Sequence, residues 1–364
     1  MKINYKAVSI IIAISIVGFL IWYFSEIVVV LLISVILSLM GHPIIRFFDS
    51  LHFKKIKLPH TLNTIFTLFI LLSAISGLFI LILPPILMQA KSVSEIDFNS
   101  IQSSMQQPLQ SIEQWLLSHH IIQQGQTMQS LASTEMSLFL KKINIISTFG
   151  DLLSLMAKLL INVFCVIFIT FFFLKDEGLF FKSVLLFIPE KHKTATEHVF
   201  ATSKRILSRY FLGLMAEMLS VFVLVSSGLF FIGVKNAMLI GFISGVMVII
   251  PYVGVIISAM IAIMLCIASN VGLDFYIFTF PLIVRMLIVF TVAKIIDDFI
   301  LQPFIYSNSV KAHPLEIFII IIISGSVAGI VGMMLAIPVY TLIRIVAKEF
   351  LSKFNIVKKL TGNL

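Results

Sequence analysis

Two adjacent carboxylates and a lysine stand in an apolar part of the sequence. Asp297 and Asp298 occur in the stretch AKIIDDFILQPFIY, and Lys294 lies four residues before Asp298. Residues four apart share one face of a helix, so we expect Lys294 to pair with Asp298. Ionisable groups are costly inside a membrane and usually pair or line an ion path. Neighbours on a regular helix point about 100° apart, which leaves Asp297 as the candidate for contact with a solute or an ion.

A second chemical feature is a break inside an apolar run. The stretch MLIGFISGVMVIIPYVGVIISAMIAIML is apolar throughout but contains Pro251, Tyr252 and Gly254. Proline removes a backbone donor, and a broken helix at membrane depth persists only where protein or a water-filled cavity satisfies the freed groups. Such breaks are typical of solute sites in secondary transporters, and a proline kink packed against neighbouring helices is the alternative.

A similar pattern recurs near the C-terminus. Gly245 precedes Pro251 by six positions, and Gly332 precedes Pro338 by the same interval, 87 residues later. Duplicated transporter halves leave this kind of weak internal repeat, and chance is the alternative. We predict that Pro338 interrupts the last apolar run as Pro251 interrupts the earlier one.

Other residues have both a functional and a structural interpretation. Arg285 lies inside an apolar run, where charge pairing is favoured, while Glu217 and Glu316 fit a charge relay or an interfacial position equally well. His313, before Pro314, has the side chain to titrate near neutral pH, but the pair also fits a plain helix start. Small-residue spacing that lets membrane helices pack closely is present at Gly325, Gly329 and Gly332.

Composition defines the class of protein. Of 364 residues, 59% are hydrophobic and 12% are charged, so we expect a polytopic membrane protein. The net charge of +9 is best explained by cytoplasmic Lys and Arg rather than by nucleic-acid binding. Cys165 and Cys266 lie in apolar runs and form neither a disulfide framework nor a metal motif. The sequence contains no phosphate-binding loop, zinc-type helix or voltage-sensor series, so we expect no enzyme and no cofactor.

The apolar runs and the Lys/Arg distribution predict the organisation, because positive residues stay on the cytoplasmic side. We expect an all-α polytopic membrane protein with about eight apolar segments, two of them broken or re-entrant, plus a soluble helical insertion. Both termini are expected in the cytoplasm. The expected parts are transmembrane helices 1–3 at 1–88, an extracytoplasmic helical insertion at 89–150, helix 4 at 151–174, cytoplasmic amphipathic helices hinged at Pro189 at 175–209, a transport core with broken helices at 210–348, and a cytoplasmic tail at 349–364.

Several stretches together resemble one family. They are FFFLKDEG, YFLGL, GVKNAMLIGFISGVMVIIPYVG and QPFIYSNSVKAHPLEIFIIIIISGSVAGIVGMMLAIPVY. Through them most of the chain resembles the AI-2E transporter family, also called the autoinducer-2 exporter or PerM-like permease family. His42 stands where Asn is commoner, and Ser307 replaces a frequent glycine. The resemblance implies an oligomeric transporter of the bacterial inner membrane, and it adds Gln302 and Pro303 to the candidate residues.

Three functions follow as hypotheses. The first is export of a small polar metabolite, with the quorum-sensing signal autoinducer-2 as the family's named cargo. The second is Na⁺ or Li⁺/H⁺ antiport through Asp297 or Asp298. The third is a membrane scaffold or receptor, which two broken segments disfavour because an anchor needs no cavity at the membrane midplane. The expected partners are the lipid bilayer, a small-molecule or cation substrate and further copies of the chain, without nucleic acid or a bound metal.

Overall fold

The computed structural model of this chain is all-helical in the part that it describes, which confirms the expected fold class. Most of the expected first helix, most of the insertion at 89–150 and most of the tail at 349–364 lie outside that part. The described residues are 15–16, 18–20, 23–50, 59–94, 149–176, 178–186, 188–250, 253–270, 273–303 and 313–351.

Five of the described helical segments are long and apolar enough to cross a membrane, judged by length and composition. They lie within α2 (Ser25–Ser50), α3 (His60–Ser94), α8 (Glu190–Phe231), α11 (Phe280–Ile296) with its flanking π-helical turns, and α13 (Pro314–Phe350). Large apolar side chains such as Phe69, Phe230 and Ile288 are exposed along them. Water disfavours such surfaces and lipid covers them. The chain is therefore a multi-pass membrane protein.

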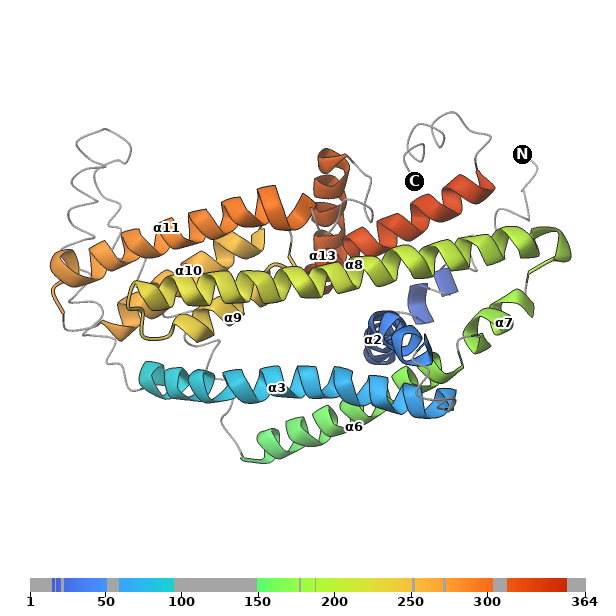
Figure 1. The fold of residues 1–364 in the computed structure, drawn as a ribbon, viewed down its shortest axis with the longest axis horizontal. Helices are drawn as coiled ribbons and strands as arrows, with labels where there is room; N and C mark the ends of the chain where they lie inside the picture. The colour runs from blue at the N-terminus through green and yellow to red at the C-terminus, as the bar shows by residue number, and fades with distance from the viewer. Residues whose placement is uncertain are drawn as a thin grey trace. The chain divides into compact units, whose positions relative to one another are not determined.

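The helices group into two compact units, and α3 and α8 contribute to both (Figure 1). Unit 1 combines Met1–Ile75 with Thr148–Phe211, and unit 2 combines Ser76–Ser147 with Leu212–Leu364. Unit 1 also contains α6 (Phe149–Lys175) and α7 (Leu179–Leu186), and unit 2 contains α9 (Ala237–Met247), α10 (Val253–Ser269), η1 (Phe275–Thr279), α11, η2 (Asp297–Leu301) and α13.

Pro189 lies between α7 and α8, at the position expected for a hinge. Beyond it, α8 runs without interruption to Phe231, so the amphipathic stretch and the following apolar run form one helix. The sequence analysis had treated them as separate helices because the charged residues end near residue 209. A change of polarity alone does not end a helix, since backbone hydrogen bonding continues where no proline interrupts it, and α8 contains none.

Unit 1 packs its helices through small and hydroxyl-bearing residues. A Cβ on Gly41 would lie 2.9 Å from a methyl carbon of Leu174, so α2 and α6 approach closely there. The Thr170 hydroxyl donates to the Ser34 carbonyl at 3.5 Å, and the Ser208 hydroxyl donates to a carbonyl of α2 at 2.7 Å. Neutral contacts of this kind join helices in membranes.

The apolar run at 237–268 folds into a helical hairpin. Asn236, just before α9, donates from its amide to the Ser269 hydroxyl at the end of α10 at 3.4 Å, so the two helices are antiparallel. At the other end, a Cβ on Gly254 would lie only 1.8 Å from the Met247 carbonyl oxygen. Only glycine permits this approach. The arms are about 16 and 25 Å long, less than the roughly 30 Å of a bilayer core.

α13 is a second hairpin. The chain reverses at Ala328 and Gly329, where Gly329 has φ +58°. The Tyr340 hydroxyl donates to Glu316 Oε2 at 2.7 Å, although the two residues would be about 36 Å apart on a straight helix. A Cβ on Gly332 would lie 2.0 Å from the carbonyl oxygen of a residue on the opposite arm.

The expectation that Pro338 breaks the last apolar run is therefore wrong. Pro338 is buried inside the second arm of α13, and the chain reverses earlier, at Ala328 and Gly329. Proline removes one helical hydrogen bond and is tolerated in membrane helices, whereas a reversal needs backbone angles that glycine adopts without steric cost. An 87-residue shift would align Pro251 with Pro338, which lies inside a helical arm, so the reversal at Gly329 does not follow the proposed repeat.

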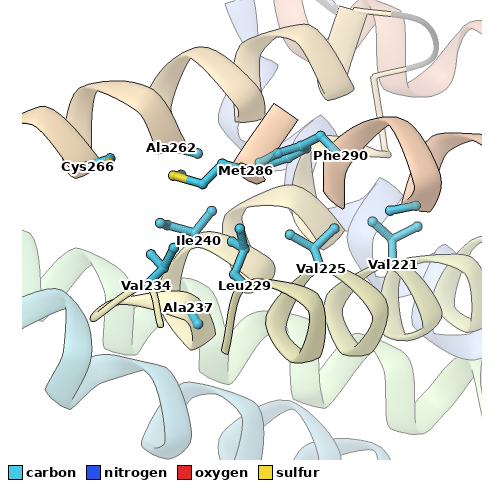
Figure 2. Packing of buried hydrophobic residues seen from close by; sticks show 11 residues of the cluster. Val221, Val225, Leu229, Val234, Ala237, Ile240, Ala262, Cys266, Met286 and Phe290 are labelled. Carbon is cyan, nitrogen blue, oxygen red and sulfur yellow. The ribbon is translucent and has the colours of Figure 1, made fainter. Parts of the chain in front are cut away.

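The core of unit 2 lies among α8, α9, α10 and α11 (Figure 2). A Cβ on Gly241 would lie 2.7 Å from a backbone nitrogen of α8, and one on Gly245 would lie 2.6 Å from an α8 carbonyl oxygen. α9 therefore lies directly against the α8 backbone, in the close packing that small residues allow. This packing holds the first hairpin beside α11.

Candidate functional site

A lysine, two carboxylates and an amide meet where α11 continues into the π-helical turn η2. Lys294 Nζ lies 3.0 Å from Asp297 Oδ2 and 2.7 Å from Asp298 Oδ1. Gln302 Nε2 donates to Asp297 Oδ2 at 3.0 Å and to Asp298 Oδ1 at 3.4 Å. We call these four residues the Asp297 cluster. The expected pairing of Lys294 with Asp298 is present, and Lys294 also contacts Asp297, because a lysine side chain reaches positions three and four residues ahead.

The two carboxylates differ in exposure, and one oxygen of Asp297 lacks a hydrogen-bond partner among the described residues. The Asp297 side chain is 3% exposed, whereas that of Asp298 is 45% exposed. Asp297 Oδ2 is held by Lys294 and Gln302, but Asp297 Oδ1 is buried without a hydrogen-bond partner among the described residues. A buried oxygen left in this state is costly. Asp297 Oδ1 is therefore the atom of the cluster best placed to accept a proton, a water molecule or a cation.

A small cavity adjoins Asp297. It is lined by residues of α8, α9, α10 and α11, mostly apolar, with the hydroxyls of Ser244 and Ser258 as additional polar groups. The space open to the centre of a water molecule is about 10 Å³, which is close to the lower limit for one water. The Ser244 and Ser258 hydroxyls donate to carbonyls of their own helices, at 2.8 and 2.9 Å. Their oxygen lone pairs therefore remain as acceptors.

The backbone around the cluster is unusual. Asp297 and Asp298 open η2, where backbone hydrogen bonds span five residues instead of four. Single π-helical turns of this kind are rare and occur frequently at functional sites. Val248, directly after α9, also lines the cavity, so the turn region of the first hairpin reaches the same place. Polar side chains, an irregular turn and a hairpin end therefore converge within unit 2.

Comparison with known proteins identifies the class. A family model described as "AI-2E family transporter" matches residues 10–352. The chain belongs to the AI-2E transporter family. The family consists of transporters, and the resemblance found in the motifs is confirmed.

Two relatives in Bacillus subtilis (strain 168) carry transport in their names. The chain is 24% identical over 325 residues to "Putative transport protein YueF", covering 86% of this chain and 81% of the relative. It is 28% identical over 184 residues to "Putative transport protein YrrI", covering 50% of each chain. Neither name states what is transported.

Other predicted residues of this AI-2E transporter lie away from the cluster or beside it. Arg285 is exposed on α11, about 18 Å before Asp297 along the helix. Glu217 is 3% exposed on α8, one turn before Val221, which lines the cavity. Pro303 is exposed next to Gln302. Pro251 and Tyr252 lie outside the described residues.

The predicted residues of the last apolar run build α13 itself. His313 begins the helix, with its ring accepting from the Leu315 backbone N–H at 3.3 Å, which matches the plain helix-start interpretation. Gly329 forms the reversal, and Gly325 and Gly332 allow the two arms to approach. These glycines thus pack α13 against itself.

Sequence reasoning missed three polar contributors. Ser244 and Ser258 lie in apolar runs, and only their positions, one before Gly245 and four after Gly254, hint that they face the same space. The hydrogen bond from Tyr340 to Glu316 depends on the reversal at Ala328 and Gly329, whereas the sequence predicts the break at Pro338. Contacts between distant turns are not visible in local spacing.

Proposed function

We propose that this AI-2E transporter exchanges protons for Na⁺ or Li⁺ at Asp297. The observation that supports the proposal is that two carboxylates share one ammonium group, so Asp297, Asp298 and Lys294 together carry a formal charge of −1 when ionised. An uncompensated charge at a buried site is costly. One proton or one monovalent cation neutralises this charge, and binding both would give the three residues a net positive charge. Competition between the two is the basis of antiport.

The geometry assigns different roles to the two carboxylates in this proposal. Asp298 is half-exposed and contacts Lys294 at the shorter distance, 2.7 Å, so it can keep Lys294 paired while Asp297 binds a proton or a cation. Asp297, whose Oδ1 has no hydrogen-bond partner among the described residues, lines one cavity with Ser244 and Ser258. Carboxylate and hydroxyl oxygens are the ligands that hard cations prefer.

The size of the cavity favours a cation over a metabolite. With space for about one water molecule, it accommodates a partly dehydrated monovalent ion more readily than a metabolite of several heavy atoms. Export of a small polar metabolite such as autoinducer-2 is the second candidate. It is supported by the two hairpins, whose reversals interrupt helices within apolar runs and leave backbone groups for a solute.

Proton movement in everted membrane vesicles tests the first function. We expect Na⁺ or Li⁺, added to vesicles that hold a respiration-driven pH gradient, to release protons as reported by a pH-sensitive dye. Asp297→Asn should abolish the signal. Asp274→Asn is the matched control, because Asp274 is exposed in the same unit and asparagine keeps its capping contact with the Ile277 N–H.

The outcomes separate the candidates. A full signal in Asp297→Asn would refute the assignment of exchange to Asp297. Absence of any cation-dependent signal in the unmodified protein, together with export of labelled autoinducer-2 from cells, would replace the first function by the second.

We also propose that the chain lies in the inner membrane of a bacterial cell with both termini in the cytoplasm and 89–150 outside. The Lys/Arg distribution supports this orientation. A membrane-impermeant thiol reagent should label Ser130→Cys in intact cells, and labelling only after lysis would contradict the orientation. The family resemblance supports assembly with further copies of the chain, which light scattering of the detergent-solubilised protein would test.

A further inference from the structure

Unit 2 contains a second cavity, at the end of the α9–α10 hairpin away from its turn. Its polar lining comes from Lys235, Asn236, Ser269 and Asn270, and Cys266 also lines it. We call it the outer pocket. The space open to the centre of a water molecule is about 50 Å³, enough for several waters. No carboxylate belongs to its described lining, where the one charged side chain is that of Lys235.

The two cavities lie along the same three helical segments in a common register. Each segment contributes residues to both cavities, and one such pair on each segment is eight positions apart. The pairs are Asn236 and Ser244 at α9, Cys266 and Ser258 on α10, and Leu282 and Phe290 on α11. Eight residues of helix correspond to about 12 Å. These pairs therefore lie about two helical turns apart, although Ile240 on α9 also lines the outer pocket, one turn from Ser244.

An apolar layer occupies the midpoint of this distance. The residues four positions from each member of the pairs are Ile240, Ala262 and Met286, with exposed fractions of 2%, 0% and 0%. All three belong to one cluster of buried apolar side chains, and Figure 2 shows Met286 next to Ala262 with Ile240 beneath. We call these three residues the plug. Such a layer excludes water, so it separates the outer pocket from Asp297.

Met286 is the member of the plug that can move at least cost. Ala262 has no side-chain rotamer, and the β-branched side chain of Ile240 is stiff about its first torsion. Methionine is unbranched, with three rotatable bonds, and adapts to irregular spaces. A rotamer change of Met286 needs no movement of a helix.

We propose that the outer pocket is a second solute site, which holds small hydrated polar species, and that Met286 is the gate between this site and Asp297. The pocket's amide and hydroxyl groups bind water or a hydrated monovalent ion weakly, which suits a site that loads or unloads the path. This inference rests on the proposed function, because it makes Asp297 the inner end of the path. With the proposed orientation, the outer pocket opens outside the cell.

Thiol labelling tests the gate without requiring transport. In a Cys165→Ser, Cys266→Ser background, Ser269→Cys reports on the outer pocket and Ser258→Cys on the Asp297 cavity. A small cationic methanethiosulfonate reagent, applied outside intact cells, should label Ser269→Cys and leave Ser258→Cys protected. Adding Met286→Ala should raise the labelling rate of Ser258→Cys at least about tenfold, because the plug loses its largest side chain. Met264→Ala, the same substitution at an exposed position of α10, should leave the rate unchanged.

The outcomes are decisive in both directions. Equal labelling of Ser258→Cys with and without Met286→Ala would refute Met286 as the gate, and failure to label Ser269→Cys would refute the outer pocket. If Met286→Ala reduces the amount of protein in the membrane, Met286→Ser and Ile240→Val replace it. Each of these two variants should raise the labelling rate of Ser258→Cys per inserted protein molecule. If Asp297→Asn retains cation exchange while the labelling pattern holds, the proposed function fails and the gated path remains. If Asp297→Asn abolishes cation exchange while Met286→Ala leaves the labelling of Ser258→Cys unchanged, the gate is refuted and the proposed function remains.

Discussion

The two helical hairpins of unit 2 close in different ways. The α9–α10 hairpin has no charged residue between Ala237 and Ser269, and its arms meet through the close approach of Gly254 to the Met247 carbonyl. α13 is joined across its arms by a hydrogen bond between two side chains, from Tyr340 to a carboxylate oxygen of Glu316. The first hairpin depends on backbone contact and on charges supplied by α11. The second carries its own polar closure.

This difference separates two kinds of intramembrane carboxylate. Asp297 has an ammonium partner but keeps one buried oxygen without a partner among the described residues. Glu316 accepts from a neutral phenol, and the Arg344 guanidinium lies 5.6 Å from the centre of the Tyr340 ring. A hairpin can thus hold a carboxylate in its own closure, as α13 does, or lie beside one that another helix holds, as α9–α10 does. Substitutions in the Asp297 cluster and at Gly254 should therefore have larger effects than substitutions at Gly329 and Tyr340.

The largest effect is expected from removing the cation of the Asp297 cluster. Lys294→Met leaves a buried carboxylate without its ammonium partner, so thermal unfolding in detergent should show a loss of about 3–5 kcal/mol. Lys235→Met, at an exposed lysine of the same unit, is the control and should change little. The double variant Lys294→Met, Asp297→Asn should recover much of the loss, and equal stability of the two lysine variants would contradict a buried pair.

Closing the first hairpin depends on a missing side chain. Gly254→Ala would place a methyl group 1.8 Å from the Met247 carbonyl oxygen, and overpacking against rigid backbone should cost about 3 kcal/mol. The same unfolding measurement checks this value. Gly77→Ala is the matched control, since nothing lies within 4 Å of the added carbon. An unchanged unfolding temperature in Gly254→Ala would show that the arms are farther apart than described.

The reversal of α13 should be more tolerant. Gly329 has φ +58° and ψ −141°, which disfavours a side chain, but nothing lies within 4 Å of an added Cβ. Gly329→Ala should therefore cost only the backbone strain, about 2 kcal/mol. A loss greater than that of Gly254→Ala in the same assay would reverse the contrast between the hairpins.

The smallest effect is expected at the closure of α13. Tyr340→Phe removes one hydrogen bond to Glu316, and such bonds between membrane helices contribute about 1 kcal/mol. Unfolding of this variant, compared with Tyr23→Phe at an exposed tyrosine, measures the contribution. Cation-dependent proton movement should persist in Tyr340→Phe and vanish in Asp297→Asn. Loss of exchange in both variants would place α13 in the exchange mechanism as well.

Local spacing predicted much of the site and part of the fold. The pairing of Lys294 with Asp298 follows from a four-residue interval on one helix, and the interruption of the run at 237–268 follows from its proline and glycines. The predicted position of the reversal in α13 is wrong because it relied on Pro338 as the helix breaker. The neighbouring residues in the sequence do not indicate the backbone angles of Gly329. The burial of Asp297 also depends on helices distant in sequence.

By itself, the sequence determined that this is an all-helical membrane protein of the AI-2E transporter family, because composition, apolar run length and motif residues are properties of single segments. It also determined which charged residues stand in apolar surroundings. Only the tertiary structure decided that Asp297 rather than Asp298 is buried, that Ser244 and Ser258 line the same cavity, and that the last apolar run folds back to join Tyr340 to Glu316. The physical reason is that burial and shared cavities arise from several helices packing together, so no single segment encodes them.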